Sequence, residues 1–312
     1  MPSLLVRFRV DLLLFLVAAS WGSTYLVAKE LVTPSSVMAL LAVRMLLAAS
    51  VMGAVVAVRG RRVIAAELRA GVGLGMLLAA VFVLETFGIA HTSATNAGLI
   101  ISLTIVFTPI LDSVVSGRRL PGAFMVAATI AVVGVALLAG NGALQPPNLG
   151  DLLVLGAAVV RAIHVTSMPK RTADRPMDTL HLTTVQLATC AAVFSVGSVL
   201  HGDSIPQYVA QLDLVRAMLL LYLVLACTVF AFFVQIWAVQ RTSPSRVSLL
   251  LGTEPIWAAL IGITIAHDSL TPAGYCGIAL ILAGTAWGRS LEQGHRLAAE
   301  PAERQPSAAG SL

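Results

Sequence analysis

The stretch Glu85-Thr86-Phe87-Gly88 with Thr92-Ser93-Ala94-Thr95-Asn96 decides the fold, because a related stretch recurs later in the chain. Gln235-Ile236-Trp237-Ala238 and Thr242-Ser243-Pro244-Ser245-Arg246 realign on it at an offset of 150 residues. At the same offset Leu99 falls on Leu249, Leu120 on Leu270, Ala123 on Ala273 and Gly134 on Gly284. Each copy consists of long apolar segments. The sequence therefore predicts an internal repeat of membrane helices, an architecture that places a binding site between the two copies.

The composition excludes a soluble protein. The chain is 58% hydrophobic and 11% charged, with a mean hydropathy of +0.90, whereas a soluble domain carries about 25% charged residues. The net charge of +5 comes from loops and tails and forms no basic face with interleaved aromatics, so we expect no nucleic-acid partner. Cys190, Cys227 and Cys276 each stand alone in an apolar run, so no disulfide framework, metal site or cofactor is expected.

Apolar segments of the length needed to cross a bilayer, about 20 residues, occur ten times. They are residues 12–31, 37–58, 71–90, 97–116, 122–140, 151–169, 179–200, 214–238, 247–266 and 272–290. The predicted fold is an all-α integral membrane protein with ten transmembrane helices. Residues 1–140 form a first five-helix repeat, residues 151–290 form a second, and the polar residues 291–312 form a disordered cytoplasmic tail.

The distribution of lysine and arginine orients the helices, because cytoplasmic loops carry an excess of both. With the N-terminus inside, the inner loops and tails hold 16 of the 20 basic residues. These are Arg7, Arg9, Arg59, Arg61, Arg62, Arg69, Arg118, Arg119, Lys170, Arg171, Arg175, Arg241, Arg246, Arg289, Arg296 and Arg304. Only Lys29 and Arg216 lie near the outer ends of helices. We therefore predict a multi-pass protein of the inner membrane with both termini in the cytoplasm.

An odd number of helices in each copy makes the two copies run in opposite directions, which is an inverted repeat. One alternative concerns the N-terminus, where Arg7, Arg9, an apolar run and Ala18-Ala19-Ser20 resemble a signal peptide. The alignment of Asp11-Leu12-Leu13 with Asp151-Leu152-Leu153 favours a retained first helix instead.

Several motifs resemble the EamA-type permeases of the drug/metabolite transporter superfamily. They are Trp21-Gly22-Ser23, Arg44, the stretch 85–98, Gln240-Arg241-Thr242-Ser243-Pro244-Ser245-Arg246, Glu254-Pro255-Ile256-Trp257 and Leu280-Ile281-Leu282-Ala283-Gly284. The resemblance spans roughly residues 10–290. It implies a ten-helix carrier of small metabolites, often an exporter of amino acids or related compounds. The sequence departs from the family pattern at 266–270 and at Arg161, where a tryptophan is common, so substrate preference does not transfer.

Ionisable residues inside a membrane are costly, about 2.5–3.5 kcal/mol each on insertion scales, and mark functional sites. In the first copy, Arg44 and Glu85 lie at a similar depth below the outer surface, so an ion pair between them is geometrically feasible. It would be either a structural pair or a charged wall of the substrate cavity. In the second copy, Glu254 and Arg161 approach the midplane from opposite sides, and Pro255 predicts a kink beside Glu254.

Other polar residues extend the list of substrate-binding or coupling candidates. Trp21 and Tyr25 share one face of the first helix with Lys29. Thr104, Thr108, Asp112 and Ser116 form a polar stripe on the fourth helix, for which hydrogen bonds to a carbonyl or a neighbouring helix are the alternative. Asn96 and Gln235, from the repeated stretch, complete the list. His164 is expected to be a helix-packing residue, and Gly71 with Gly75 and Gly284 with Gly288 predict close helix packing.

These observations together predict a secondary transporter that exports a small organic metabolite, such as an amino acid or a drug-like compound, by alternating access. Its partners are the small-molecule substrate, the lipid bilayer and protons as the candidate coupling ion; a monomer and a homodimer are both compatible. The chain shows no Ser/His/Asp, Cys/His or HExxH grouping, so an enzyme is not expected. A ring of selectivity groups, as in a channel, is not visible either. The alternative is a lipid or polyprenyl-carrier flippase of the same fold.

Overall fold

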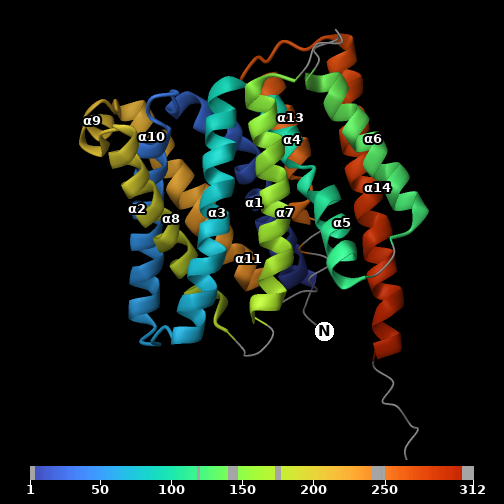
Figure 1. Cartoon of the computed structure of the whole chain (residues 1–312), viewed down its shortest axis with the longest axis horizontal. Helices are drawn as coiled ribbons and strands as arrows, with labels where there is room; N and C mark the ends of the chain where they lie inside the picture. Colours follow the sequence, from blue (N-terminus) through green and yellow to red (C-terminus); the bar gives the residue numbers. More distant parts are fainter. Residues whose placement is uncertain are drawn as a thin grey trace, which may run out of the picture.

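The computed structural model describes residues 4–117, 120–139, 147–172, 177–239, 247 and 250–303, and all the regular elements in these ranges are helical (Figure 1). The first half contains α1 (Leu4–Leu31), α2 (Val37–Val58), α3 (Ala65–His91), α4 (Ala94–Ile101), α5 (Thr104–Ser116) and α6 (Gly122–Ala139). The second half contains α7 (Leu149–Thr172), α8 (Thr179–His201), α9 (Ile205–Ala210), α10 (Leu214–Val224), the π-helix η1 (Leu225–Phe230), α11 (Ala231–Val239), α13 (Glu254–Thr264) and α14 (Pro272–Glu303).

Eight segments of the described chain are long and apolar enough to cross a bilayer. They correspond to the first eight expected spans; α4 and α5 together make one of them, and α10, η1 and α11 contribute to another. The apolar helix α13 has 11 residues, and the expected ninth span also includes residues outside the described ranges. The described part of the chain is therefore that of a helical, multi-pass membrane protein, with ten spans as the prediction for the whole.

The fourth expected span of each repeat is interrupted at the same place. The first breaks at Ser102-Leu103 before α5, and the second breaks at Gly252-Thr253 before α13. Both breaks are tight turns whose amides bond three residues back: Leu103 to the Ile100 carbonyl, and Thr253 to the Leu250 carbonyl, each at 3.1 Å. In the second copy Pro255 supplies no backbone donor, which weakens the helical hydrogen bonding beside this break. The sequence predicted this kink at Pro255 but not its counterpart in the first copy.

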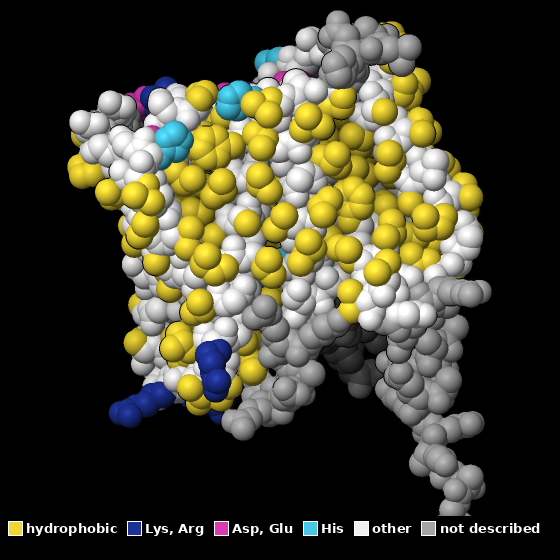
Figure 2. Space-filling view, viewed as in Figure 1, with side chains coloured by type: hydrophobic (Ala, Val, Ile, Leu, Met, Phe, Trp, Pro, Cys, Tyr) yellow, Lys and Arg dark blue, Asp and Glu magenta, His cyan; other side chains and the backbone are white. Residues whose placement is uncertain are grey.

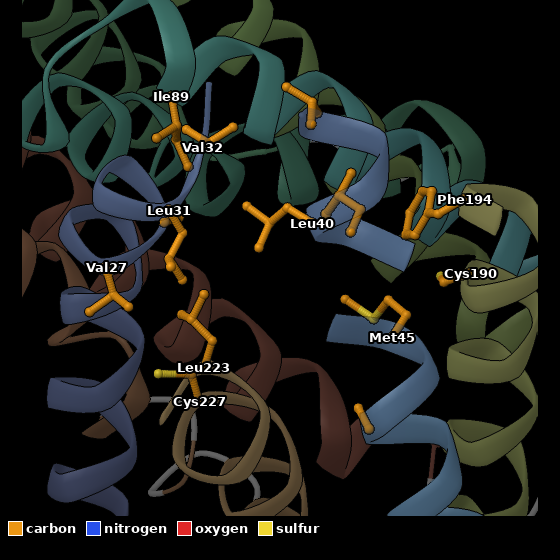
Figure 3. Packing of buried hydrophobic residues seen from close by; sticks show 14 of the residues in the cluster. Val27, Leu31, Val32, Leu40, Met45, Ile89, Cys190, Phe194, Leu223 and Cys227 are labelled. Atoms are coloured by element: carbon orange, nitrogen blue, oxygen red, sulfur yellow. The ribbon is translucent and has the colours of Figure 1, made fainter. Parts of the chain in front are cut away.

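Small residues allow the helices to approach closely. A Cβ on Gly71 would lie 2.6 Å from Val185 Cγ1, and one on Gly284 would lie 2.7 Å from the Ala127 carbonyl oxygen. These contacts join α3 to α8 and α6 to α14, and they confirm the expected close packing. Between α1, α2, α3, α8 and α10 a continuous apolar core includes Leu31, Leu40, Ile89, Phe194 and Leu223 (Figure 3).

The outer surface of the bundle suits lipid contact. Figure 2 shows a broad field of apolar side chains across the side of the molecule, with Lys, Arg, Asp and Glu confined to its two ends. Large apolar side chains in α8 lie open, among them Val199 at 79% and Leu200 at 82% exposed. In water such a surface would be an association site; in a bilayer it is the lipid-facing wall.

One boundary differs from the expectation. The helix α14 continues to Glu303, so residues 291–303 are helical rather than disordered. The segment contains Leu, Glu, Gln, Arg and Ala, which are good helix formers, and this propensity outweighs its polarity. The rest of the expected tail lies outside the described residues.

Candidate functional site

A cluster of charged and hydroxyl side chains lies inside the bundle and joins both repeats. We call it the central cluster: Tyr25 on α1, Arg44 on α2, Glu85 on α3, Arg161 on α7 and Glu254 on α13. The Tyr25 hydroxyl donates a hydrogen bond of 2.7 Å to Glu254 Oε1. This bond links the two repeats at the helix break, because Glu254 is the first residue of α13.

Arg161 balances the carboxylates of the central cluster. Its guanidinium attracts both Glu254 and Glu85 electrostatically and lies within reach of the Tyr25 hydroxyl. No nitrogen–oxygen contact within 4.0 Å joins it to either carboxylate among the described residues. Glu85, with 7% of its surface exposed, accepts no hydrogen bond in the described part of the chain. Both carboxylates therefore lie near the positive charge of Arg161, but neither forms an ion pair with it at contact distance.

Arg44 is also incompletely satisfied. It is 7% exposed, its guanidinium carbon lies 5.3 Å from the centre of the Phe82 ring, and Nη2 donates a long hydrogen bond of 3.4 Å to Thr228 Oγ1. Its Nε is buried and has no hydrogen-bond partner. A buried donor without a partner costs about 1–3 kcal/mol, so the position of Arg44 lowers the stability of the fold.

The π-helix η1 borders the central cluster and ties α1 to α2. The Trp21 indole Nε1 donates to the Cys227 carbonyl at 3.0 Å, and Cys227 Sγ donates to the Ser20 carbonyl at 3.2 Å. One residue on, the Thr228 hydroxyl faces Arg44. A single π-helical turn inside an α-helix frequently occurs at a functional site, because the extra residue frees carbonyls and redirects side chains.

The ion pairs that the sequence suggested are not formed at contact distance. Arg44 and Glu85 interact electrostatically, but no contact within 4.0 Å joins them among the described residues. The same holds for Arg161 and Glu254. In place of a direct pair, Tyr25 provides the hydrogen bond to Glu254 and Thr228 provides the bond to Arg44.

Other sequence candidates lie outside the central cluster. Asn96 donates to Asp151 Oδ1 at 3.2 Å, at the end of the bundle where α3 ends and α7 begins. Thr104, at the break before α5, bonds to the carbonyls of Ile101 and Ala158. Thr108 lies further along α5 and Gln235 on α11, both partly exposed.

His164 forms the buried helix-packing contact that was expected. Its Nε2 lies 2.8 Å from Gln186 Oε1, which joins α7 to α8. Within the described ranges, no group of three or more His, Cys, Asp or Glu side chains lies close enough to hold a metal ion.

Sequence reasoning missed Thr228, Phe82 and the aspartates Asp151 and Asp268. A lone threonine in an apolar run carries no signal, because the π-helical turn that directs Thr228 toward Arg44 has no sequence signature. Asp151 was noticed only as part of the repeat alignment. Asp268 stood in a predicted loop, and its hydrogen bonds to Thr95 N and Oγ1 depend on the three-dimensional packing of α4 against α13.

A charged cluster inside a bundle of membrane helices is typical of polytopic membrane transporters. The model of the EamA-like transporter family matches residues 8–140 and 148–287, and the chain belongs to this family. It is 26% identical over 284 residues to an uncharacterized transporter of Archaeoglobus fulgidus, with 88% of this chain and 84% of that protein aligned. A solved crystal structure has the same fold, with a TM-score of 0.60 and 18% identity over 93% of this chain and 98% of the other.

Proposed function

We propose that this chain is a secondary transporter of the inner membrane that exports a small organic metabolite, such as an amino acid or a drug-like compound. Two inverted five-helix repeats would rock about the central cluster and open it alternately to the two sides. The family supports a membrane transporter and, since its members are permeases, a role other than catalysis.

One observation carries the proposal: charged groups of both repeats meet at a broken helix inside the bundle. Transporters of this type bind substrate near the membrane midplane, where interrupted helices expose polar backbone groups. Glu254 begins α13 directly after the break, and Tyr25 from the other repeat bonds to it. The unpartnered Arg44 Nε and the unsaturated Glu85 leave both a donor and an acceptor for a substrate.

The packing of the helices supports the inverted relationship. The contact of α1 with α13 has its counterpart in the contact of α7 with α5. The contact of α3 with α7 likewise has its counterpart in the contacts of α10, η1 and α11 with α1. These counterparts arise when each membrane span of the first repeat is exchanged with the span five positions later in the second repeat. The two helix breaks match under the same exchange.

The charges of the central cluster suit coupling to protons. Two guanidinium groups, Arg44 and Arg161, face two carboxylates, Glu85 and Glu254, so the formal charges sum to zero. A cationic group of the substrate, such as the ammonium of an amino acid, would compete with a proton for Glu85 or Glu254. Only one of the two would then be bound at a time, so the site would carry a proton in one direction and the substrate in the other.

The experiment compares the extracellular metabolites of cells that express the wild type, Glu254→Gln or Glu30→Gln at matched membrane abundance. Glu30 is an exposed carboxylate at the end of α1, so its neutralisation is the matched control. The proposal expects one compound class to accumulate outside with the wild type and the control but not with Glu254→Gln. Equal export by all three removes Glu254 from the mechanism. An unchanged metabolite profile with the wild type contradicts export and favours a flippase, which lipid-scrambling assays would detect.

A further inference from the structure

The end of the bundle where α3 ends and α7 begins carries a second polar cluster, which the proposed mechanism does not use. It surrounds the turn between α3 and α4, residues Thr92–Asn96, which belongs to the first repeat. Two carboxylates of the second repeat bind this turn from different elements. Asp268 lies between α13 and α14, and Asp151 lies in the first turn of α7. We call these contacts the end latch.

Asp268, a residue of the second repeat, caps the start of α4 in the first repeat. Its Oδ2 accepts hydrogen bonds from Thr95 N at 2.9 Å and from Thr95 Oγ1 at 2.7 Å. Thr95 is the second residue of α4, where the backbone amides have no partner within the helix and a negative charge is favourable. Ser93 caps the next amide, that of Asn96, from within the turn. The start of α4 is thus capped by one residue of its own turn, Ser93, and by one residue of the opposite repeat, Asp268.

The backbone before Asp268 is held in an unusual conformation. His267 has a φ of 53° and is the one residue other than glycine with positive φ among the described residues. Such a conformation is uncommon for a residue with a side chain and clusters at switch regions. The Asp268 amide also donates to the Gly262 carbonyl at 3.1 Å. This turn folds the chain back over the end of α13 and brings Asp268 to α4.

Asp151 and Lys29 complete the end latch on the α3 side. Asp151 Oδ1 accepts from Thr92 Oγ1 at 2.5 Å and from Asn96 Nδ2 at 3.2 Å. Lys29 Nζ donates to the carbonyls of Ile89 and Thr92 at 2.9 and 2.6 Å, where a cation stabilises the end of a helix. The latch therefore binds the turn through charged groups on three other elements.

We propose that the end latch is the outer gate: Asp151 and Asp268 hold the Thr92–Asn96 turn and close the outer side in this conformation, and their release opens it. The inference rests on the proposed function and orientation. Its geometry fits a gate, because every Asp268 bond to α4 crosses between the repeats and would break when the repeats rock apart. Hydrogen bonds to charged groups can be exchanged for water, unlike the tightly packed apolar core beneath them.

The test uses the native Cys227 as a reporter, with Cys190 and Cys276 replaced by serine. Cys227 is 3% exposed and lies beside Arg44, so a membrane-impermeant thiol reagent added to intact cells reaches it only through an open outer side. Asp268→Asn and Asp151→Asn keep the shape of the side chain but remove the charge. Each should raise the labelling rate about tenfold, the factor that corresponds to ~1.4 kcal/mol.

The matched control is Asp213→Asn, since Asp213 accepts from Arg216 N at 2.8 Å within the start of its own helix. Its labelling rate should remain that of the parent. If an aspartate variant does not fold, Thr95→Val should still raise the rate, while Thr95→Ser should not. Unchanged labelling in folded Asp268→Asn, Asp151→Asn and Thr95→Val overturns the gate and leaves the exporter standing. A latch effect without any exported compound overturns the exporter and leaves the gate.

Discussion

The central cluster and the end latch use the same kinds of side chain in opposite ways. In the end latch, Asp268 accepts two hydrogen bonds and Lys29 donates two, all between 2.6 and 2.9 Å. In the central cluster, Glu85 accepts none from the described chain and Arg44 makes one long bond. A saturated set of charges holds a conformation, whereas an unsaturated set in an apolar interior is costly unless something else binds there. The contrast agrees with the proposals that one region closes the molecule and the other receives the substrate.

The largest expected effect is on transport by variants of the central carboxylates. Glu254→Gln and Glu85→Gln keep the size of the side chain but disturb the charge balance with Arg44 and Arg161. We expect export of the identified compound to fall at least about tenfold, since that corresponds to only ~1.4 kcal/mol. Export rates at matched membrane abundance measure this effect. Glu30→Gln should export like the wild type, and an equal loss in that variant would mean that carboxylate charge in general is responsible.

The next effect concerns packing beside the central cluster. A Cβ on Gly22 would lie 2.5 Å from Trp257 Cβ and 2.8 Å from the backbone nitrogen of Ala258. Gly22→Ala should therefore lower the free energy of unfolding by about 1–3 kcal/mol through overpacking of α1 against α13. Gly53 has no atom within 4 Å of the same position, so Gly53→Ala should not destabilise. Thermal unfolding of the purified variants measures this difference. Equal unfolding midpoints for Gly22→Ala and Gly53→Ala would contradict the tight α1–α13 contact.

Asp151→Asn tests whether the end latch is mainly a structural closure. The substitution leaves Thr92 and Asn96 with a neutral partner in place of a carboxylate, which should cost about 1–2 kcal/mol of stability. Export should fall less than in Glu254→Gln, because the substitution weakens the closure of the outer side but leaves the substrate site intact. Thermal unfolding and export are measured on the same preparation. A loss of export as large as that of Glu254→Gln would erase the distinction between the two regions.

The smallest effect is expected at Thr228, which contacts Arg44 through a hydrogen bond of 3.4 Å. Thr228→Val removes the hydroxyl and keeps the shape, so Arg44 loses its one hydrogen bond. The affinity for the exported compound should then fall by about 0.5–1.5 kcal/mol in binding free energy. Thr228→Ser should restore the wild-type affinity for the exported compound. If valine and serine behave alike, the π-helical turn positions nothing at Arg44.

The helices were largely predictable from the sequence because long apolar segments between turn residues report membrane spans directly. The residues of the central cluster were predictable too, since an ionisable side chain in an apolar helix is costly and so conspicuous. Their contacts were not: whether Arg44 meets Glu85 or Thr228 depends on helix rotation and on a π-helical turn. The sequence does not predict the end latch, because polar residues such as Asp268 are common in loops and therefore do not stand out.

The central claim is that the central cluster binds the exported compound, and ligand protection of the purified protein tests it most directly. The thermal unfolding midpoint is measured with and without the compound found by metabolite profiling, for the wild type, Glu254→Gln and Asp268→Asn. The account predicts a rise of the midpoint in the wild type and in Asp268→Asn and no rise in Glu254→Gln. Equal protection of all three proteins would contradict it and place the substrate elsewhere.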